Sequence, residues 1–205
     1  MHARKSTSKG SPAQVDKAKE VIEKTVSGRV KDLPGFRGGY WLIDRQTGEG
    51  VTFTFFESEE HLKGSREAAN QIRSSALSEI GAEVTGVDEF EVALDTGKKV
   101  HHDASHARVV QFEGDPNAIK MIEQVVLPRA RQLPGFLGGF WLFDTATNKG
   151  VGVTLFDSVE NLGKSREIAN QIRSEGAGQT QGRIGEFKEY EVLARAETPT
   201  GAGAR

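Results

Sequence analysis

The chain has 205 residues, carries 27 Lys and Arg against 29 Asp and Glu, and contains no cysteine. A net charge of -2 without a clustered basic stripe argues against nucleic acid as a partner. The lack of cysteine excludes disulfides and thiolate chemistry. The start, MHARKSTSKGSP, lacks the apolar core of a signal peptide, and no run approaches the ~20 apolar residues that span a bilayer. We therefore expect a cytoplasmic protein with no membrane partner.

The chain is a duplication. Residues 33–73 align with residues 133–173 without a gap, and 25 of these 41 positions are identical. Upstream, His-Ala-Arg occurs at His2 and again at His106, an offset of 104, so the first copy carries four extra residues. Four residues make about one helical turn and can lengthen a helix without rotating its buried face. We expect a first repeat at 1–95, a linker at 96–105, a second repeat at 106–195 and a flexible tail at 196–205.

The elements of a repeat follow from its second copy, taken in chain order. A strand is predicted at 107–114, then a helix that Asp115 caps and that is kinked or restarted at Pro128. LPGF forms a turn whose glycine permits positive φ, and two strands flank the short turn ATNK as a hairpin. A second helix begins after Ser158, and a last strand starts near Phe187. The order β-α-β-β-α-β is that of a ferredoxin-like unit.

The hairpin is apolar on both faces of the predicted sheet. Tyr40 and Leu42 point to one side while Trp41 and Ile43 point to the other, because successive side chains alternate along a strand. Helices cover only one face of such a sheet, so the other face needs a second cover. We therefore predict an α+β fold in which tandem ferredoxin-like β-α-β-β-α-β units form a single-chain pseudo-dimeric α+β barrel. Further self-association stays open.

The first strand differs between the copies. Its second copy contains the apolar run VVQF, whereas the matching residues of the first copy read KSTS. One interpretation is that the two cavities differ and that only one takes a lipophilic ligand. The alternative is that the first strand of copy one pairs weakly at a sheet edge or is disordered, since lysine there would blunt an exposed edge.

The motifs of each repeat resemble a known group. LPGF-x-G-G, a strand, a turn of the T-x-x-G type and a helix that opens after F-x-S resemble antibiotic-biosynthesis-monooxygenase-type domains of the dimeric α+β barrel superfamily. The resemblance covers nearly the whole chain in two fused copies. It implies a cavity between sheet and helices in each half and a protein that binds or oxidises a small aromatic or lipophilic compound without a tightly bound metal. If the chain is an enzyme, the resemblance implies a cofactor-independent monooxygenase.

Two other functions stay open. One is a non-catalytic ligand-binding or stress-associated structural barrel, whose centre would be filled by Phe and Leu. The other, a weaker third, is haem binding or degradation. The haem-degrading branch of the superfamily needs a histidine on the second helix, where this chain has His61 in copy one and Asn161 in copy two. We therefore expect no cofactor.

Two sets of residues are candidates for ligand binding, and no catalytic residue is identified. The hairpin carries a tryptophan at the same place in each copy, which either walls an aromatic ligand or belongs to the core. The second helix carries a polar stripe that either binds an anion or pairs with surface carboxylates. The candidates are Trp41, Arg66, Asn70, Arg73, Trp141, Arg166, Asn170 and Arg173.

The run HHDASH at 101–106 places three histidines and an aspartate together. It lies in the predicted linker, and no second cluster completes a metal site. We therefore expect no metal there.

Overall fold

The computed structural model describes residues 1–96, 101–114, 117–179 and 183–198. The chain divides into two compact units. The first unit joins Met1–Glu89 to the chain from Leu193 onward, and the second unit is Phe90–Val192. The boundaries between the units therefore fall inside strands β4 and β8, and not in the predicted linker.

In chain order, the first part runs strand, helices, two strands, helices and strand. A 3-10 turn (Pro12–Gln14) and a π-helical turn (η2, Ile22–Val26) interrupt its first helical segment. The elements are β1 (His2–Lys9), α1 (Val15–Val21), α2 (Ser27–Lys31), β2 (Phe36–Ile43), β3 (Glu49–Phe56), α3 (Glu59–Gly64), α4 (Arg66–Glu79) and β4 (Glu83–Asp95).

The remainder of the chain repeats that order, with a second π-helical turn (η3, Ile122–Val126). Its elements are β5 (His106–Glu113), α5 (Asn117–Met121), α6 (Leu127–Ala130), β6 (Phe136–Asp144), β7 (Lys149–Phe156), α7 (Val159–Lys164), α8 (Arg166–Gln179) and β8 (Arg183–Glu197).

The π-helical turns are 100 positions apart, whereas the first strands are 104 apart. The four extra residues of the first copy therefore lie between β1 and η2, where a 3-10 turn and α1 occupy more chain than α5 does. Pro128 stands at the start of α6, where the sequence predicts a kink or restart. The first unit makes the same turn with Gly28 at the matching position, so proline is not needed for it.

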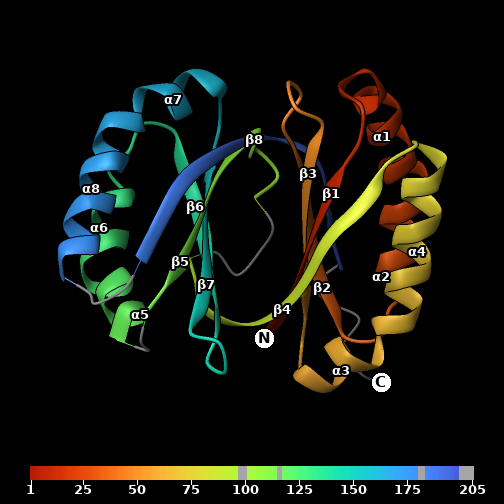
Figure 1. The fold of residues 1–205 in the computed structure, drawn as a ribbon, viewed down its shortest axis with the longest axis horizontal. Coiled ribbons are helices and arrows are strands. Elements are labelled where there is room, and N and C mark those ends of the chain that lie inside the picture. The colour runs from red at the N-terminus through yellow and green to blue at the C-terminus, as the bar shows by residue number, and fades with distance from the viewer. Residues whose placement is uncertain (97–100, 115–116, 180–182, 199–205) are drawn as a thin grey trace. The chain divides into compact units, whose positions relative to one another are not determined.

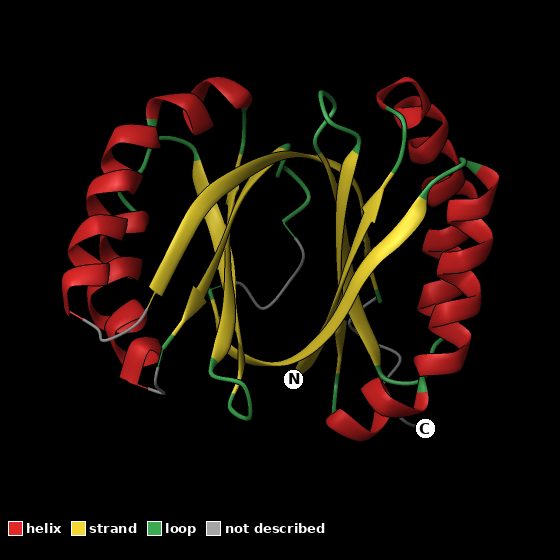
Figure 2. Ribbon diagram, viewed as in Figure 1, coloured by secondary structure: helices red, strands yellow, loops and turns green. Residues whose placement is uncertain are grey.

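In each unit the helices form one layer against one face of the strands. Figure 1 shows α1, α2 and α4 beside β1, β2 and β3, and Figure 2 shows the same layering of helices over strands in the second unit. The hydrogen-bonded strand order is β1-β3-β2-β8 in the first unit and β8-β5-β7-β6-β4 in the second. One cluster of buried apolar side chains joins the helices to the strands of the first unit. It includes Phe36, Trp41, Phe56, Leu62 and Ile72.

Strand β1 is a full member of its sheet despite its polar sequence. It pairs antiparallel with β3 from His2 opposite Phe56 to Lys9 opposite Glu49. Arg4, Lys5 and Ser6 are buried. The expectation of a weakly paired or disordered first strand is therefore wrong, because these polar groups find partners inside the unit.

The LPGF turns adopt the predicted conformation. Gly35 and Gly135 have φ of +70° and +66°, in the left-handed region that favours glycine. A side chain at Gly35 would also collide with His61, since its Cβ would come within 2.3 Å of the imidazole ring. Glycine at this position thus serves both the turn and the close approach of α3.

The ends of the predicted segments differ from the structure. β8 extends to Glu197 and Ala196 is buried, so the first residues of the predicted tail are packed. Thr198 Oγ1 also donates to the Phe36 carbonyl at 2.8 Å. Within the predicted linker Ala104 is fully buried. Residues 97–100 and 199–205 lie outside the described residues.

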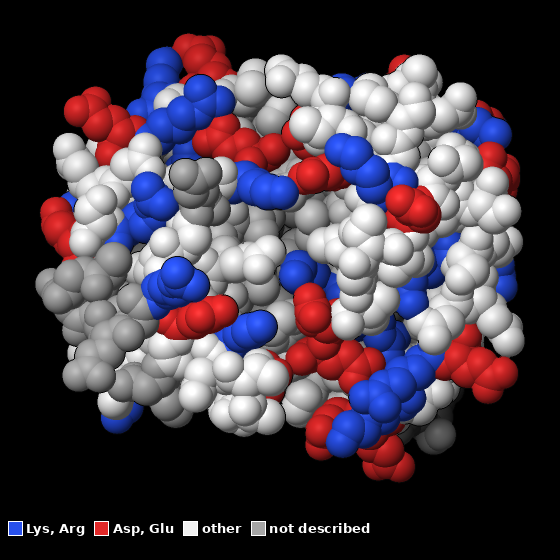
Figure 3. All heavy atoms as spheres, in the orientation of Figure 1, with Lys and Arg blue, Asp and Glu red and all other residues white. Residues whose placement is uncertain are grey.

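Charges of both signs are interspersed over the face of the molecule in Figure 3. On that face, acidic side chains accompany the Lys and Arg side chains. Ion pairs form along the helices as well: Lys63 pairs with Glu59 and Lys164 pairs with Glu160, each one turn apart. No helix in the described part of the chain is long and apolar enough to span a membrane.

Candidate functional site

Each unit contains a pocket between its sheet and its helices. The cavity of the first unit measures about 120 Å³ and that of the second about 100 Å³. The helical wall of each is apolar and comes from matching positions, for example Ile22, Val26 and Val30 in the first unit and Ile122, Val126 and Ala130 in the second. The helical walls of the two pockets are therefore alike.

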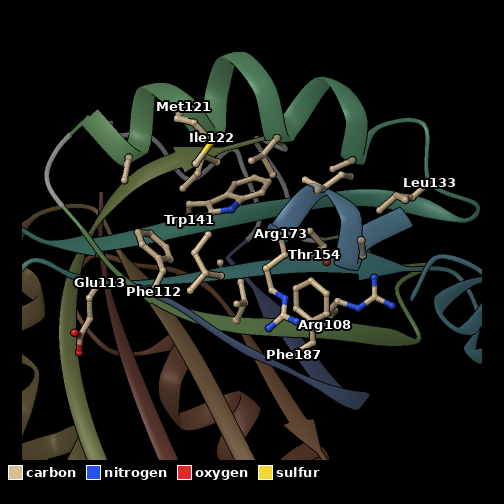
Figure 4. Close-up of a pocket in the computed structure, with 18 residues that line it drawn as sticks. Arg108, Phe112, Glu113, Met121, Ile122, Leu133, Trp141, Thr154, Arg173 and Phe187 are labelled. Atoms are coloured by element: carbon tan, nitrogen blue, oxygen red, sulfur yellow. The ribbon is translucent and has the colours of Figure 1, made fainter. Parts of the chain in front are cut away.

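A tryptophan from the hairpin lines each pocket. Trp41 and Trp141 are 6% and 3% exposed, so each is both a core residue and a pocket wall. In the second pocket the indole lies over Gly152, where a Cβ would come within 2.8 Å of Nε1. Figure 4 shows Trp141 in the middle of the pocket, below Met121 and Ile122.

An arginine from the second long helix of each unit also lines the pocket. Arg73 of α4 donates to Ser6 Oγ at 3.3 Å and to Asn70 Oδ1. Its Nε is buried without a hydrogen-bond partner, and so is the Nε of Arg173. Within the described residues neither arginine forms an ion pair with a carboxylate. Burial, and then the neighbouring cation Arg4, lowers the pKa of Arg73.

Arg173 of α8 is held differently from Arg73. Its Nη1 donates to the Gly185 carbonyl at 2.9 Å, and its guanidinium lies 5.2 Å from the centre of the Phe187 ring. Arg108 lies 5.1 Å from the same ring, so two cations contact Phe187. Figure 4 shows all three side chains at one end of the pocket. Cations over an aromatic face are stabilised by its quadrupole.

The other polar candidates lie outside the pocket linings. Arg66 pairs with Glu89 on the surface, its side chain 56% exposed, and Arg166 pairs with Glu189 in the same way, 62% exposed. Asn70 and Asn170 are exposed. The structure therefore brings Trp41 to one pocket with Arg73, and Trp141 to the other with Arg173, whereas the rest of the helical stripe does not line the pockets.

Sequence reasoning missed a buried arginine at one end of each pocket. Arg4 donates to Ser65 Oγ at 3.1 Å and to the Leu62 carbonyl at 2.6 Å, and it pairs with Glu89 at 2.9 Å. The second unit repeats this set with Arg108, Ser165, Leu162 and Glu189. Arginine, serine and glutamate recur at matching positions of both copies, and this recurrence was the available signal.

Both glutamates of these ion pairs are held as carboxylates. Burial raises the pKa of Glu89, but hydrogen bonds from Arg66 and Arg4 outweigh it, so the pKa lies below its usual value. Glu189 has a lowered pKa for the same reason, with Arg166 and Arg108 as donors. Arg4 and Arg108 therefore each have a carboxylate partner, unlike Arg73 and Arg173.

The residues present do not suit haem. His61 is half-buried at the start of α3, where Ser58 Oγ contacts its Nδ1 at 3.1 Å, and it lines neither pocket. The linings contain no histidine, cysteine or tyrosine in the described part of the chain. The described residues also contain no group of three or more metal-ligating side chains, His101 and His102 included.

Comparison with known sequences finds relatives across the whole chain. No family model matches it. An uncharacterized protein of Mycobacterium tuberculosis is 23% identical over 205 residues, which cover 97% of this chain and 86% of that protein. A second uncharacterized protein of the same organism is 25% identical over 206 residues, covering 97% and 91%.

Solved structures share the fold. A protein of Fusobacterium nucleatum provisionally named a monooxygenase superimposes with a TM-score of 0.67 at 16% identity, covering 96% of this chain and 94% of that one. An anthrone oxidase-like protein gives 0.63 at 16% identity over 100% and 96%. A provisionally named monooxygenase from Lactobacillus acidophilus gives 0.57 at 10% identity over 96% of each. The chain thus has the mixed α+β fold of monooxygenase-like proteins.

Proposed function

We propose that this chain is a single-chain, pseudo-dimeric α+β barrel protein that binds small aromatic anions in the pockets of its two units. The observation that carries the proposal is the pairing of Trp41 with Arg73, and of Trp141 with Arg173, in otherwise largely apolar pockets. A half-buried guanidinium without a carboxylate partner is costly, and an anionic ligand would neutralise it. The indole supplies an aromatic wall for a ring.

The size of the cavities limits the ligand. An engineered apolar cavity of roughly 150 Å³ holds one benzene ring. Cavities of about 100 and 120 Å³ are smaller than this, so the ligand can carry at most one ring. The three fused rings of anthrone, which the name of one structural neighbour contains, exceed this space. A benzoate or phenolate has a single ring and carries the negative charge that would neutralise the arginine.

Calorimetric titration with benzoate tests the proposal, with benzamide as a neutral ligand of the same shape. We expect benzoate to bind two sites and benzamide to bind at least tenfold more weakly, because hydrogen bonds to a charged group contribute about 1.5–3 kcal/mol. The double variant R73Q/R173Q should lose this preference. The control R66Q/R166Q removes two exposed arginines of the same helices and should retain it. Equal binding of benzoate and benzamide by the native protein would refute the proposal.

Oxidation of the bound compound is a second candidate function. A cofactor-independent oxygenase requires a substrate anion that gives an electron to O2, and an arginine in the pocket would stabilise that anion. It also requires a proton acceptor. The carboxylate that lines a pocket is Glu113, which points away from Trp141 in Figure 4. Oxygen consumption with a one-ring substrate, hydroquinone, tests this candidate: a rate above the spontaneous one that R73Q/R173Q abolishes would support oxidation, and the absence of such a rate would leave binding alone.

A further inference from the structure

The two pockets share some of their strand residues and differ in others. The shared residues include one cross-strand pair: β1 and β3 place Arg4 opposite Thr54, and β5 and β7 place Arg108 opposite Thr154. One step further along the pocket the first unit pairs Ser6 with Thr52, whereas the second pairs Val110 with Gly152. These four residues line their pockets. We call these residues, together with Ser8 of the first pocket and Phe112 of the second, the floor of each pocket, and the two floors differ in polarity.

The floor of the first pocket carries hydroxyl groups. Ser6 Oγ accepts from Arg73, which places one hydroxyl beside the proposed anion site. Ser8 and Thr52 also line this pocket, and their hydroxyls form no hydrogen bond with any described residue. Hydroxyl groups can donate and accept, so they suit a ligand with hydroxyls of its own.

The floor of the second pocket is apolar and partly filled. Phe112 occupies the position of Ser8, and its ring lies over Gly150, where a Cβ would come within 2.2 Å. It also stacks on Phe143 at 6.2 Å between centroids. Phe187 lines the same pocket, whereas the matching Val87 is 42% exposed and does not line the first pocket. A ligand in the second pocket therefore meets rings and methyl groups.

We infer that the two pockets select different ligands: the first takes a hydroxylated aromatic anion, and the second takes an aromatic anion with a bare or alkylated ring. This inference rests on the proposed function, because it assumes that both pockets bind aromatic anions. A ligand hydroxyl finds Ser8 or Thr52 in the first pocket. On the floor of the second pocket, at Val110 and Phe112, it loses water without gaining a partner, which disfavours binding by roughly tenfold or more.

Titration of proteins with one working pocket tests the inference. R173Q leaves the first pocket intact and R73Q leaves the second, and the probes are 3,4-dihydroxybenzoate and 4-ethylbenzoate. We expect R173Q protein to prefer the dihydroxy compound and R73Q protein to prefer the ethyl compound, each at least tenfold. The same preference in both proteins, or none in either, would overturn the inference while the proposed function stands. Failure of both proteins and of the native chain to bind either benzoate would overturn the proposed function itself.

Exchange of the floors shows which residues set the preference. S6V/S8F/T52G in the R173Q background should move its preference toward 4-ethylbenzoate, and V110S/F112S/G152T in the R73Q background should move the other toward 3,4-dihydroxybenzoate. The single changes S6A and V110T alter one hydroxyl each with little change in volume and should shift the ratio in the same directions. An unchanged ratio in folded single variants, checked by circular dichroism, would contradict the role of the floor.

Discussion

Arg4 Nη2 and Glu89 Oε1 lie 2.9 Å apart in a nearly buried ion pair that joins β1 to β4, with the two side chains 2% and 21% exposed. The guanidinium also stacks on Phe56, with 5.4 Å between Arg4 Cζ and the ring centre. The Arg108–Glu189 pair repeats this arrangement at 2.8 Å. Each unit thus anchors the end of its pocket with a charge that is fully partnered.

Loss of this arginine should destabilise the protein. We expect Arg4→Met, which keeps much of the aliphatic packing, to lower the free energy of unfolding by about 2–4 kcal/mol, because Ser65, Leu62 and Glu89 lose a donor. Chemical denaturation measures the change. The exposed partner provides the control: Arg66→Met should leave the denaturation midpoint nearly unchanged. Equal effects of the two changes would contradict the burial argument.

Acid should weaken the fold through the same glutamates. The folded-state pKa values of Glu89 and Glu189 lie below the usual 4.5. Their contribution to stability is therefore present above that value and is lost as the pH falls through the folded pKa. Thermal unfolding between about pH 6 and pH 3 should show a smaller loss of stability for E89Q/E189Q than for the native chain. Parallel curves for the two proteins would show that these carboxylates do not govern acid sensitivity.

The two hairpins should respond differently to the same glycine replacement. Gly150→Ala should cost about 1–3 kcal/mol, because its Cβ would meet the Phe112 ring at 2.2 Å and the ring is stacked on Phe143. Gly50→Ala meets only the Ser8 hydroxyl, at 2.6 Å, which can rotate away. Denaturation midpoints of the two variants test this difference, and a larger effect at Gly50 would be the opposite of what we expect.

Tryptophan fluorescence should report each pocket separately. Trp41 and Trp141 are the two tryptophans of the chain, and each lines one pocket. In Trp141→Phe protein a benzoate titration should follow the first pocket, and in Trp41→Phe protein it should follow the second. Each signal should vanish when the arginine of the same pocket is changed to glutamine, and not when the other is changed. A fluorescence change that persists in both the Arg73→Gln and the Arg173→Gln variants would place the ligand outside the two pockets.

The helices, strands and turns could be predicted from the sequence because their signals are local. The repeated tryptophans, the LPGF turns and the helix caps at Ser58 and Ser158 depend on neighbours a few positions away. The polar first strand misled one interpretation, since KSTS resembles a blunted edge. Its residues are instead satisfied by long-range partners, such as Asp88 for Lys5.

The candidate site could be predicted only in part. Helical spacing places Arg66 and Arg73 on one stripe, but it does not tell a surface pair from a pocket residue. That distinction depends on Glu89 of β4, which accepts a hydrogen bond from Arg66 although it lies 23 positions further along the chain. Partners at such separations leave no mark in the local pattern. A position-by-position comparison of the two copies does show them, because Arg66 and Glu89 recur as Arg166 and Glu189.

A crystal structure with 4-bromobenzoate would test the central claim most directly, because the anomalous signal of bromine locates the ring without ambiguity. We predict one bromine site in each pocket, against Trp41 and Trp141, with each carboxylate on the guanidinium of Arg73 or Arg173. Empty pockets at saturating ligand, or carboxylates turned away from both arginines, would contradict the account.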